Sequence, residues 1–171
     1  MIMQRHFRKS SLFLLLLCFL PSCDEGLQPP QVGGSVALGT FTGLVTFTNW
    51  EAVDSLYDLR LVAFTVYPPD DILNEVLQGR AIVHPPLQTG QPFAARGTDS
   101  VSYSIVVPAK TYPYVVIAHQ FGPDVFNDWR PVGQYDLDTN LTTPSSVVVV
   151  DGQTTPNINI IVDFENPPPL P

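Results

Sequence analysis

Oxygen-bearing side chains alternate along one short stretch of the chain. Asp136, Asp138 and Asn140 follow the spacing D-x-D-x-N, with which calcium-binding loops gather hard oxygen ligands. The glycine expected next is replaced by Leu141, and no glutamate closes the loop. Asp and Asn also favour turns, because their side chains bond to nearby backbone. We therefore expect a turn here, no metal site and no cofactor, with these three residues as the only candidate ligands.

Nucleophilic catalysis needs a Ser or Cys beside a base that an acid orients. No cysteine follows Cys23, and only His84 and His119 could act as the base. His119 lies in an expected strand and should be a packed or rim side chain, whereas His84 has no acid close in sequence. Two isolated histidines are too few for a zinc site. We expect no catalytic residue and a protein that is not an enzyme.

The expected loop 121–131 carries a pair of residue types that often anchor protein interfaces, Trp129 and Arg130. Its eleven residues exceed what a hairpin needs, and loops of that length are often functional. Asp124 and Asp128 lie beside the pair. Trp129 and Arg130 are therefore our candidate binding residues. The alternative is that Trp129 folds back to cap the domain while Arg130 pairs with a nearby acid.

Aromatic residues of the expected loops could also form a platform for a sugar, because their faces stack on pyranose rings. The candidates are Trp50, Tyr57, Trp129 and Tyr135. The competing interpretation is that both tryptophans end strands and plug the edges of the domain, as large aromatic side chains often do.

The N-terminus has the layout of a secretory signal peptide. Arg5, Arg8 and Lys9 precede nine consecutive apolar residues at 12–20. Nine residues rise only about 14 Å as a helix, roughly half of the hydrocarbon thickness of a bilayer, which argues against a permanent span.

The residues that follow, Leu20-Pro-Ser-Cys23, resemble the lipobox of bacterial lipoproteins. Leu20 and Ser22 match that motif, and Pro21 departs from its commonest choice. The resemblance implies cleavage before Cys23, a thioether lipid on Cys23 and acylation of the new amine. Two or more acyl chains give stable anchoring. The alternative is an ordinary signal peptide with a cysteine at its end.

Net charge limits the partners that the exported part can have. All 16 acidic residues but only 5 of the 8 basic ones follow residue 22, which gives a net charge of 5 − 16 = −11 with neutral histidines. Nucleic-acid binding depends on Lys and Arg, so we expect no nucleic-acid partner. The same charge disfavours electrostatic binding to anionic lipid, which leaves the lipid on Cys23 as the membrane link. No disulfide is expected, because Cys18 lies in the signal peptide.

Abundant Val, Ile, Phe, Tyr and Thr, many prolines and few charged residues are typical of an all-β domain. We expect a signal peptide at 1–22, a lipidated Cys23 and tether at 23–38, a domain at 39–165 and a proline-rich tail at 166–171. The expected strands are 40–48, 58–67, 79–83, 100–107, 111–120, 132–137, 145–150 and 157–164. One short helix is possible at 70–77. Phe47, Phe64, Tyr103, Ile117 and Ile160 should be buried.

About seven strands with no helix between them predict one immunoglobulin- or prealbumin-like sandwich of two sheets. The run from Tyr103 to Ile117 resembles the strand–turn–strand centre of carboxypeptidase-regulatory-like domains, which are prealbumin-like sandwiches. The run 147–155 and the following 157–160 resemble their last hairpin, whereas Lys110 departs from the usual glycine. The resemblance covers roughly the last 70 residues and implies a fold and no activity.

These observations together predict a lipoprotein of the bacterial cell envelope, anchored by lipid on Cys23 and facing the periplasm or the cell surface. Its domain is expected to be a non-enzymatic interaction or scaffold module with an envelope protein or glycan as partner. The alternative is a carbohydrate-binding accessory lipoprotein that uses the loop aromatics. An undetected hydrolase is a third class, for which no specific residue argues.

Overall fold

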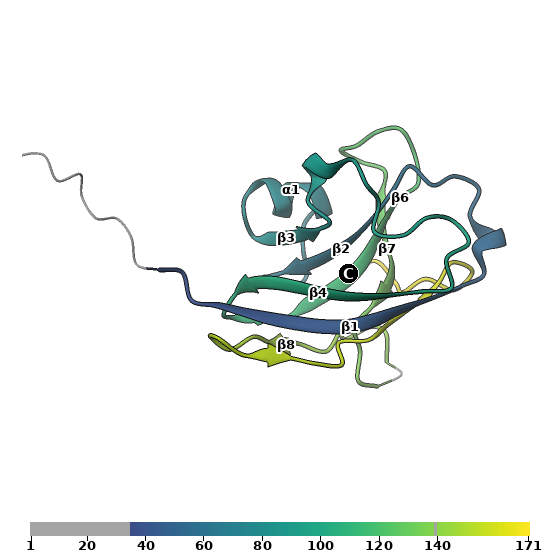
Figure 1. Ribbon diagram of the computed structural model, residues 1–171. Helices are drawn as coiled ribbons and strands as arrows, with labels where there is room; N and C mark the ends of the chain where they lie inside the picture. Colours follow the sequence, from purple (N-terminus) through teal and green to yellow (C-terminus); the bar gives the residue numbers. More distant parts are fainter. Residues whose placement is uncertain (1–34, 139) are drawn as a thin grey trace, which may run out of the picture. The chain divides into compact units, whose positions relative to one another are not determined.

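The computed structural model describes residues 35–138 and 140–171, and within them the chain forms an all-β sandwich with one short helix. One sheet has the order β10-β1-β4, with β9 also paired to β1. The second has the order β3-β2-β6-β7, and a small third sheet joins β5 to β8. In Figure 1, β1 and β4 form one layer, and β2, β3, β6 and β7 form the other.

The strands are β1 (Leu38–Thr48), β2 (Asp58–Phe64), β3 (Ala81–His84), β4 (Ser100–Pro108), β5 (Thr111–Tyr112), β6 (Tyr114–Gln120), β7 (Trp129–Gln134), β8 (Val147–Val148), β9 (Thr154–Thr155) and β10 (Ile160–Asp163).

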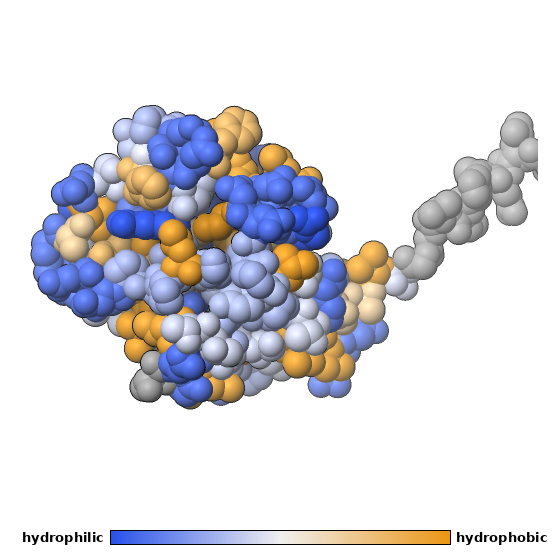
Figure 2. All heavy atoms as spheres, turned by 180° about the vertical axis from the view of Figure 1, so that it is seen from behind, coloured by the Kyte–Doolittle hydropathy of each residue, from blue (hydrophilic) through white to orange (hydrophobic). Residues whose placement is uncertain are grey.

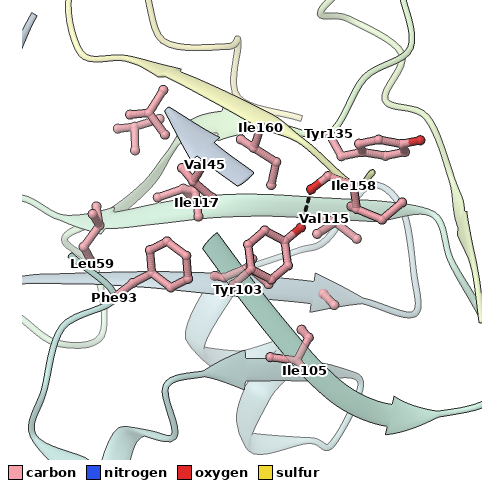
Figure 3. Close-up of a cluster of buried hydrophobic side chains, with 14 of the residues drawn as sticks. Val45, Leu59, Phe93, Tyr103, Ile105, Val115, Ile117, Tyr135, Ile158 and Ile160 are labelled. Carbon is pink, nitrogen blue, oxygen red and sulfur yellow. Dashed lines mark hydrogen bonds between the residues drawn. The ribbon is translucent and has the colours of Figure 1, made fainter. Parts of the chain in front are cut away.

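Strand alternation produces the main core between the two layers. In β1, Phe41, Val45 and Phe47 are buried, while the intervening Thr and Leu residues face outward. The five residues expected in the core are all buried, with exposed fractions of 6% or less, which confirms the predicted strand phasing. Figure 3 shows this core, in which Ile117, Ile160 and Tyr103 from different strands point toward one another.

The second sheet is buried on both faces, as the continuous apolar sequences of β2 and β6 predict. Its outer face carries Val62, Phe64 and Tyr114, and these side chains pack under the helix α1 (Ile72–Leu77). The helix begins two residues later than the predicted 70–77, because Asp71 is its N-cap and accepts a hydrogen bond from Asn74 N at 2.8 Å. We call this packed group the outer cluster: Val62, Phe64, Ala81, Tyr114, Val116 and Ala118, with Ile72, Val76, Val83 and Trp129 against it.

The predicted strand 111–120 is wrong as a single element. It is broken at Pro113, which has no N–H to donate to a ladder. Before Pro113 the chain pairs with β8, and after it with β2 and β7. The resemblance over Tyr103 to Ile117 implies a hairpin around 108–110. The strands on either side of this turn, β4 and β5, do not pair with each other, because β4 pairs with β1 and β5 with β8. Likewise β8 and β9 pair with β5 and β1 rather than as a hairpin.

Several predicted boundaries also shift. The strand expected at 58–67 ends at Phe64, although Thr65 N and Oγ1 both still donate to Arg80 O, the residue before β3. The strands expected at 145–150 and 157–164 shrink to 147–148 and 160–163, although Ile158 is still buried. The edge strand expected at 79–83 is β3, at the predicted edge position.

The predicted loop 121–131 is too long. The β6–β7 hairpin pairs Gln120 with Trp129 and His119 with Arg130, so both candidate binding residues lie in β7. Pro131, at which we expected the loop to end, faces Ala118 within this ladder. It is tolerated because β7 is an edge strand. The remaining loop is eight residues, 121–128.

The proline-rich C-terminal segment packs on the domain rather than leaving it. Phe164, just before this segment, packs on Trp50 with 4.4 Å between the ring centroids, and Pro168 is buried. Pro168 lines a groove with Val132 and Gly133 of β7. The segment therefore lies near the edge of the second sheet, across a groove that β7 and β10 also line.

Candidate binding surface around Trp129

The predicted lipidation site lies outside the described residues. Cys23 and the signal-peptide assignment fall within residues 1–34, as does the tether expected at 23–38 up to residue 34. The last tether residues are described, and β1 already begins at Leu38. Among the described residues no helix has the length and apolar character to cross a membrane.

Trp129 packs flat against the domain instead of standing free in a loop. Its indole contacts the outer cluster, and its Nε1 donates to Val125 O at 2.9 Å. The indole is half-buried, so one part of it belongs to the packing under α1 and another part stays accessible. It lies on the outer face of the second sheet, and does not cap the end of the sandwich as the alternative interpretation predicts.

A hollow of about 210 Å³ opens beside the accessible part of Trp129. One wall is the approach to α1, with Asp70 and Asp71, and another is Tyr114 at the start of β6. The remaining lining residues are Pro69, Ile72, Pro131, Leu170 and Pro171. We call this the Trp129 hollow. It combines an aromatic face with carboxylates, the combination that pockets for polar ligands use.

Two residues that line the Trp129 hollow, Tyr114 and Asp70, carry polar groups with no hydrogen-bond partner among the described residues. Tyr114 is 2% exposed, and its hydroxyl is buried without a hydrogen-bond partner. Burial raises the pKa of Tyr114, so the hydroxyl is neutral and can donate as well as accept. Asp71 is engaged as the helix cap, whereas no side chain or backbone group among the described residues bonds to the Asp70 carboxylate. Asp70 is exposed, so its carboxylate meets solvent, whereas the Tyr114 hydroxyl is buried. Unpartnered buried polar groups are uncommon, and a ligand is one explanation for them.

Arg130 has a different environment from Trp129. Its guanidinium lies over the ring of Phe121, 5.5 Å from the ring centroid. Its Nε is buried and without a partner, and the ion pairs found among the described residues do not include Arg130. Trp129 and Arg130 are adjacent in a strand and therefore point to opposite faces of the sheet. They do not form one joint binding site.

The candidate calcium ligands are used by a chain of local turns. Asp136 accepts from Ser145 Oγ at 2.9 Å, and Asp138 accepts from Asn140 N at 2.7 Å. Asn140 Oδ1 in turn accepts from both donors of Thr142. No group of three or more potential His, Cys, Asp or Glu ligands gathers in the described part of the chain. The spacing is explained by turn formation.

The two histidines are held by packing. His119 is 1% exposed, lies edge-on to Phe164 and donates from Nε2 to Ser55 O at 2.8 Å. Burial lowers the pKa of His119, an effect that the Ser55 carbonyl opposes and the charge of Arg130 supports. His84 is half-buried at the end of β3, and burial lowers its pKa too. The fold keeps these two side chains apart on different strands.

The four aromatic residues considered for a sugar platform do not gather. Tyr135 is in the main core, and Trp50 packs on Phe47 and Phe164 with its Nε1 donating to Thr98 O. Tyr57 is exposed at the start of β2. Trp129 alone of the four lines the hollow described above.

Sequence reasoning did not identify Tyr114 and Asp70 as site residues. Tyr114 looks like any apolar position of a buried strand, and Asp70 looks like a helix-start residue. A signal was present in the Pro-Pro-Asp-Asp run at 68–71, which joins a strand to a helix and must therefore turn.

A larger groove of about 550 Å³ lies between β7 and β10. Its polar groups already have partners. Asp163 accepts from Asn49 Nδ2 at 2.7 Å, and Asn159 Oδ1 accepts from Leu44 N at 2.9 Å. Of the two surfaces, the Trp129 hollow is therefore the one with polar groups left over for a ligand.

No protein-family model matches this chain. No curated protein matches it either. Among solved structures, it is similar to a leucine-rich repeat protein from Bacteroides thetaiotaomicron, with 13% identity and a TM-score of 0.36. That likeness covers 76% of this chain, which spans only 14% of the other.

Proposed function

We propose that this chain is a lipid-anchored protein of the bacterial cell envelope whose domain is a non-enzymatic interaction or scaffold module. The observation that carries the proposal is the motif Leu20-Pro-Ser-Cys23, placed directly after a short basic segment and nine apolar residues. The proposal is also supported by the burial and the hydrogen bonds of the side chains that we considered for catalysis or metal binding. His119 is enclosed in the core, and Asp136, Asp138 and Asn140 are used in turns.

The anchor is tested with Cys23→Ser and metabolic labelling by palmitate in a bacterial host. The wild-type chain should incorporate the label and fractionate with membranes. The variant should lose both properties and accumulate as an uncleaved or soluble form. Cys18→Ser is the matched control, because that cysteine lies within the expected signal peptide. Continued labelling and membrane binding of Cys23→Ser would contradict the proposal.

A second candidate function is carbohydrate binding at the Trp129 hollow. The accessible indole offers a stacking face, and Asp70 offers an exposed carboxylate that could accept from sugar hydroxyls. A glycan array on the exported chain tests this function. Asp70→Asn and Trp129→Ala should both abolish any signal, whereas Tyr57→Ala, an exposed aromatic outside the hollow, should not. An absence of glycan binding at millimolar concentration would remove this candidate.

A further inference from the structure

Exposed aliphatic side chains gather at the end of the sandwich where the described chain begins. They are Val36, Leu38, Val106, Val148 and Val150, each between 46% and 66% exposed. We call this group the apolar rim. Figure 2 shows hydrophobic residues at this end of the domain, next to residues of intermediate and hydrophilic character.

Strand pairing and hydrogen bonds bring the rim together from three segments. Leu38 on β1 is paired with Pro108 on β4, and Val106 is two residues away on the same outward face. The turn after Val150 closes onto β1, because Gly152 N donates to Leu38 O at 2.8 Å. Ala109 N donates to Ala37 O at 2.8 Å, which fixes the residues just after β4 beside the start of β1.

The composition of the rim differs from that of the surface farther along β4. Beyond Val106 the outward residues of β4 are Ser104, Ser102 and Ser100. A lysine also lies at the rim, in a domain that is otherwise strongly acidic. Lys110 is exposed and is the only lysine after residue 9. Its backbone oxygen accepts a hydrogen bond from Val149 N at 3.0 Å, which places the Lys110 backbone beside Val148 and Val150. Asp151, whose carboxylate accepts from Leu38 N at 3.1 Å, lies at the same rim, so the aliphatic side chains rather than a net charge are what would contact lipid.

We infer that the apolar rim rests on the lipid bilayer that holds the anchor, so that the domain lies on the membrane in a defined orientation. This inference depends on the proposed lipidation of Cys23. Twelve residue steps separate Cys23 from Ser35, which span about 40 Å at most. The chain enters the domain at this end, so the apolar rim is the part of the domain nearest to the anchor along the chain. A few exposed aliphatic side chains bind a bilayer only weakly by themselves. The lipid on Cys23 holds the domain at a high local concentration beside the bilayer, so these weak contacts are then largely formed.

The test uses the lipidated full-length protein reconstituted in phosphatidylcholine vesicles. After residue 23 the chain has no cysteine, and the Cys23 sulfur is alkylated, so one introduced cysteine can be labelled alone with an environment-sensitive fluorophore. Val106→Cys and Val148→Cys report on the rim. Ser100→Cys is the matched control, exposed on the same face of β4 and six residues, about 20 Å, away from Val106.

Nitroxide-labelled lipid should quench the fluorophores at 106 and 148 several-fold more than the one at 100. Leu38→Asp combined with Val150→Asp should reduce the quenching at 106 to the level of the control. Equal quenching at the three positions, or none, would overturn the inference. The inference would also be overturned if the fluorophore at position 106 were protected from quenching by aqueous iodide but not quenched by the nitroxide lipid. That result would indicate that a second copy of the chain covers the rim. A chain that does not float with vesicles refutes the anchor itself, and this outcome is distinguishable from the others.

Discussion

The hydroxyl of Tyr103 on β4 donates to the backbone carbonyl of Ile158, 55 residues later, inside the core (Figure 3). Gly43 of β1 lies beneath this bond, because a Cβ there would come within 1.9 Å of the same carbonyl oxygen. Ile158 precedes β10, and its N–H is bonded to Thr42 O at 2.9 Å. The tyrosine thus stabilises the approach of the last strand to the first where the sheet ladder has not yet begun.

Replacing Tyr103 by Phe should lower the free energy of unfolding by about 1–3 kcal/mol, because a buried carbonyl loses its donor. Urea denaturation of the exported domain measures the loss. Tyr57→Phe serves as the control, and since Tyr57 is 57% exposed its effect should stay within about 0.5 kcal/mol. An equally small effect at Tyr103 would show that water or another group replaces the hydroxyl.

Asp58 is expected to stabilise the fold through a buried cation. Arg60 is 3% exposed, and its Nε donates to Asp58 Oδ2 at 2.7 Å while its Nη1 donates to Pro85 O at 2.8 Å. Asp58→Ala should therefore cost about 3 kcal/mol, since it leaves a buried charge without its partner. Asp58→Ala combined with Arg60→Met should be less destabilised than Asp58→Ala alone. Additive losses in urea denaturation would contradict the coupling of the pair.

His119 should make stability depend on pH. Burial sets the folded-state pKa of His119 below its ordinary value of 6.5, so the unfolded chain binds protons more tightly than the folded one. The free energy of unfolding is therefore highest, as far as His119 is concerned, above pH 6.5. It decreases as the pH falls below 6.5 toward the folded-state pKa of His119. Because His84 shifts in the same direction, the measurement is made in a His84→Gln background. Adding His119→Gln should flatten the dependence of the unfolding free energy on pH in that window, and an unchanged slope would argue against a neutral, buried His119.

Trp129→Ala should reduce stability by about 2 kcal/mol, which is below the usual cost for a fully buried tryptophan because this indole is only half-buried. The lost contacts are those with the outer cluster under α1. Thermal and urea denaturation measure the change, and Phe126→Ala, at an exposed loop position, is the control. An unchanged stability with loss of partner or glycan binding would instead make Trp129 purely a recognition residue.

The sequence by itself determined the all-β class, the phasing of β1 and the burial of the five predicted core residues. These follow from a local rule, because side chains of a strand alternate between two environments over any short stretch. The cap at Asp71 and the turn at Asp136, Asp138 and Asn140 could also be predicted, since their hydrogen bonds join near neighbours in sequence. Local patterns likewise predicted that β2 and β6 are central strands.

Only the tertiary structure decided which strands pair and which side chains meet. The alternation of side chains along a strand is the same in whichever sheet the strand lies. The passage of the chain at Pro113 from one sheet to another is therefore visible in the local sequence only as one proline. The predicted loop 121–131 includes Trp129, yet Trp129 lies in the edge strand β7, which also tolerates Pro131. Tyr114 and Asp70 come together in the Trp129 hollow from segments 44 residues apart, and the apolar rim gathers three segments between 36 and 150. Such encounters depend on long-range packing, whose energy is shared among many residues and is therefore not encoded in any short sequence pattern.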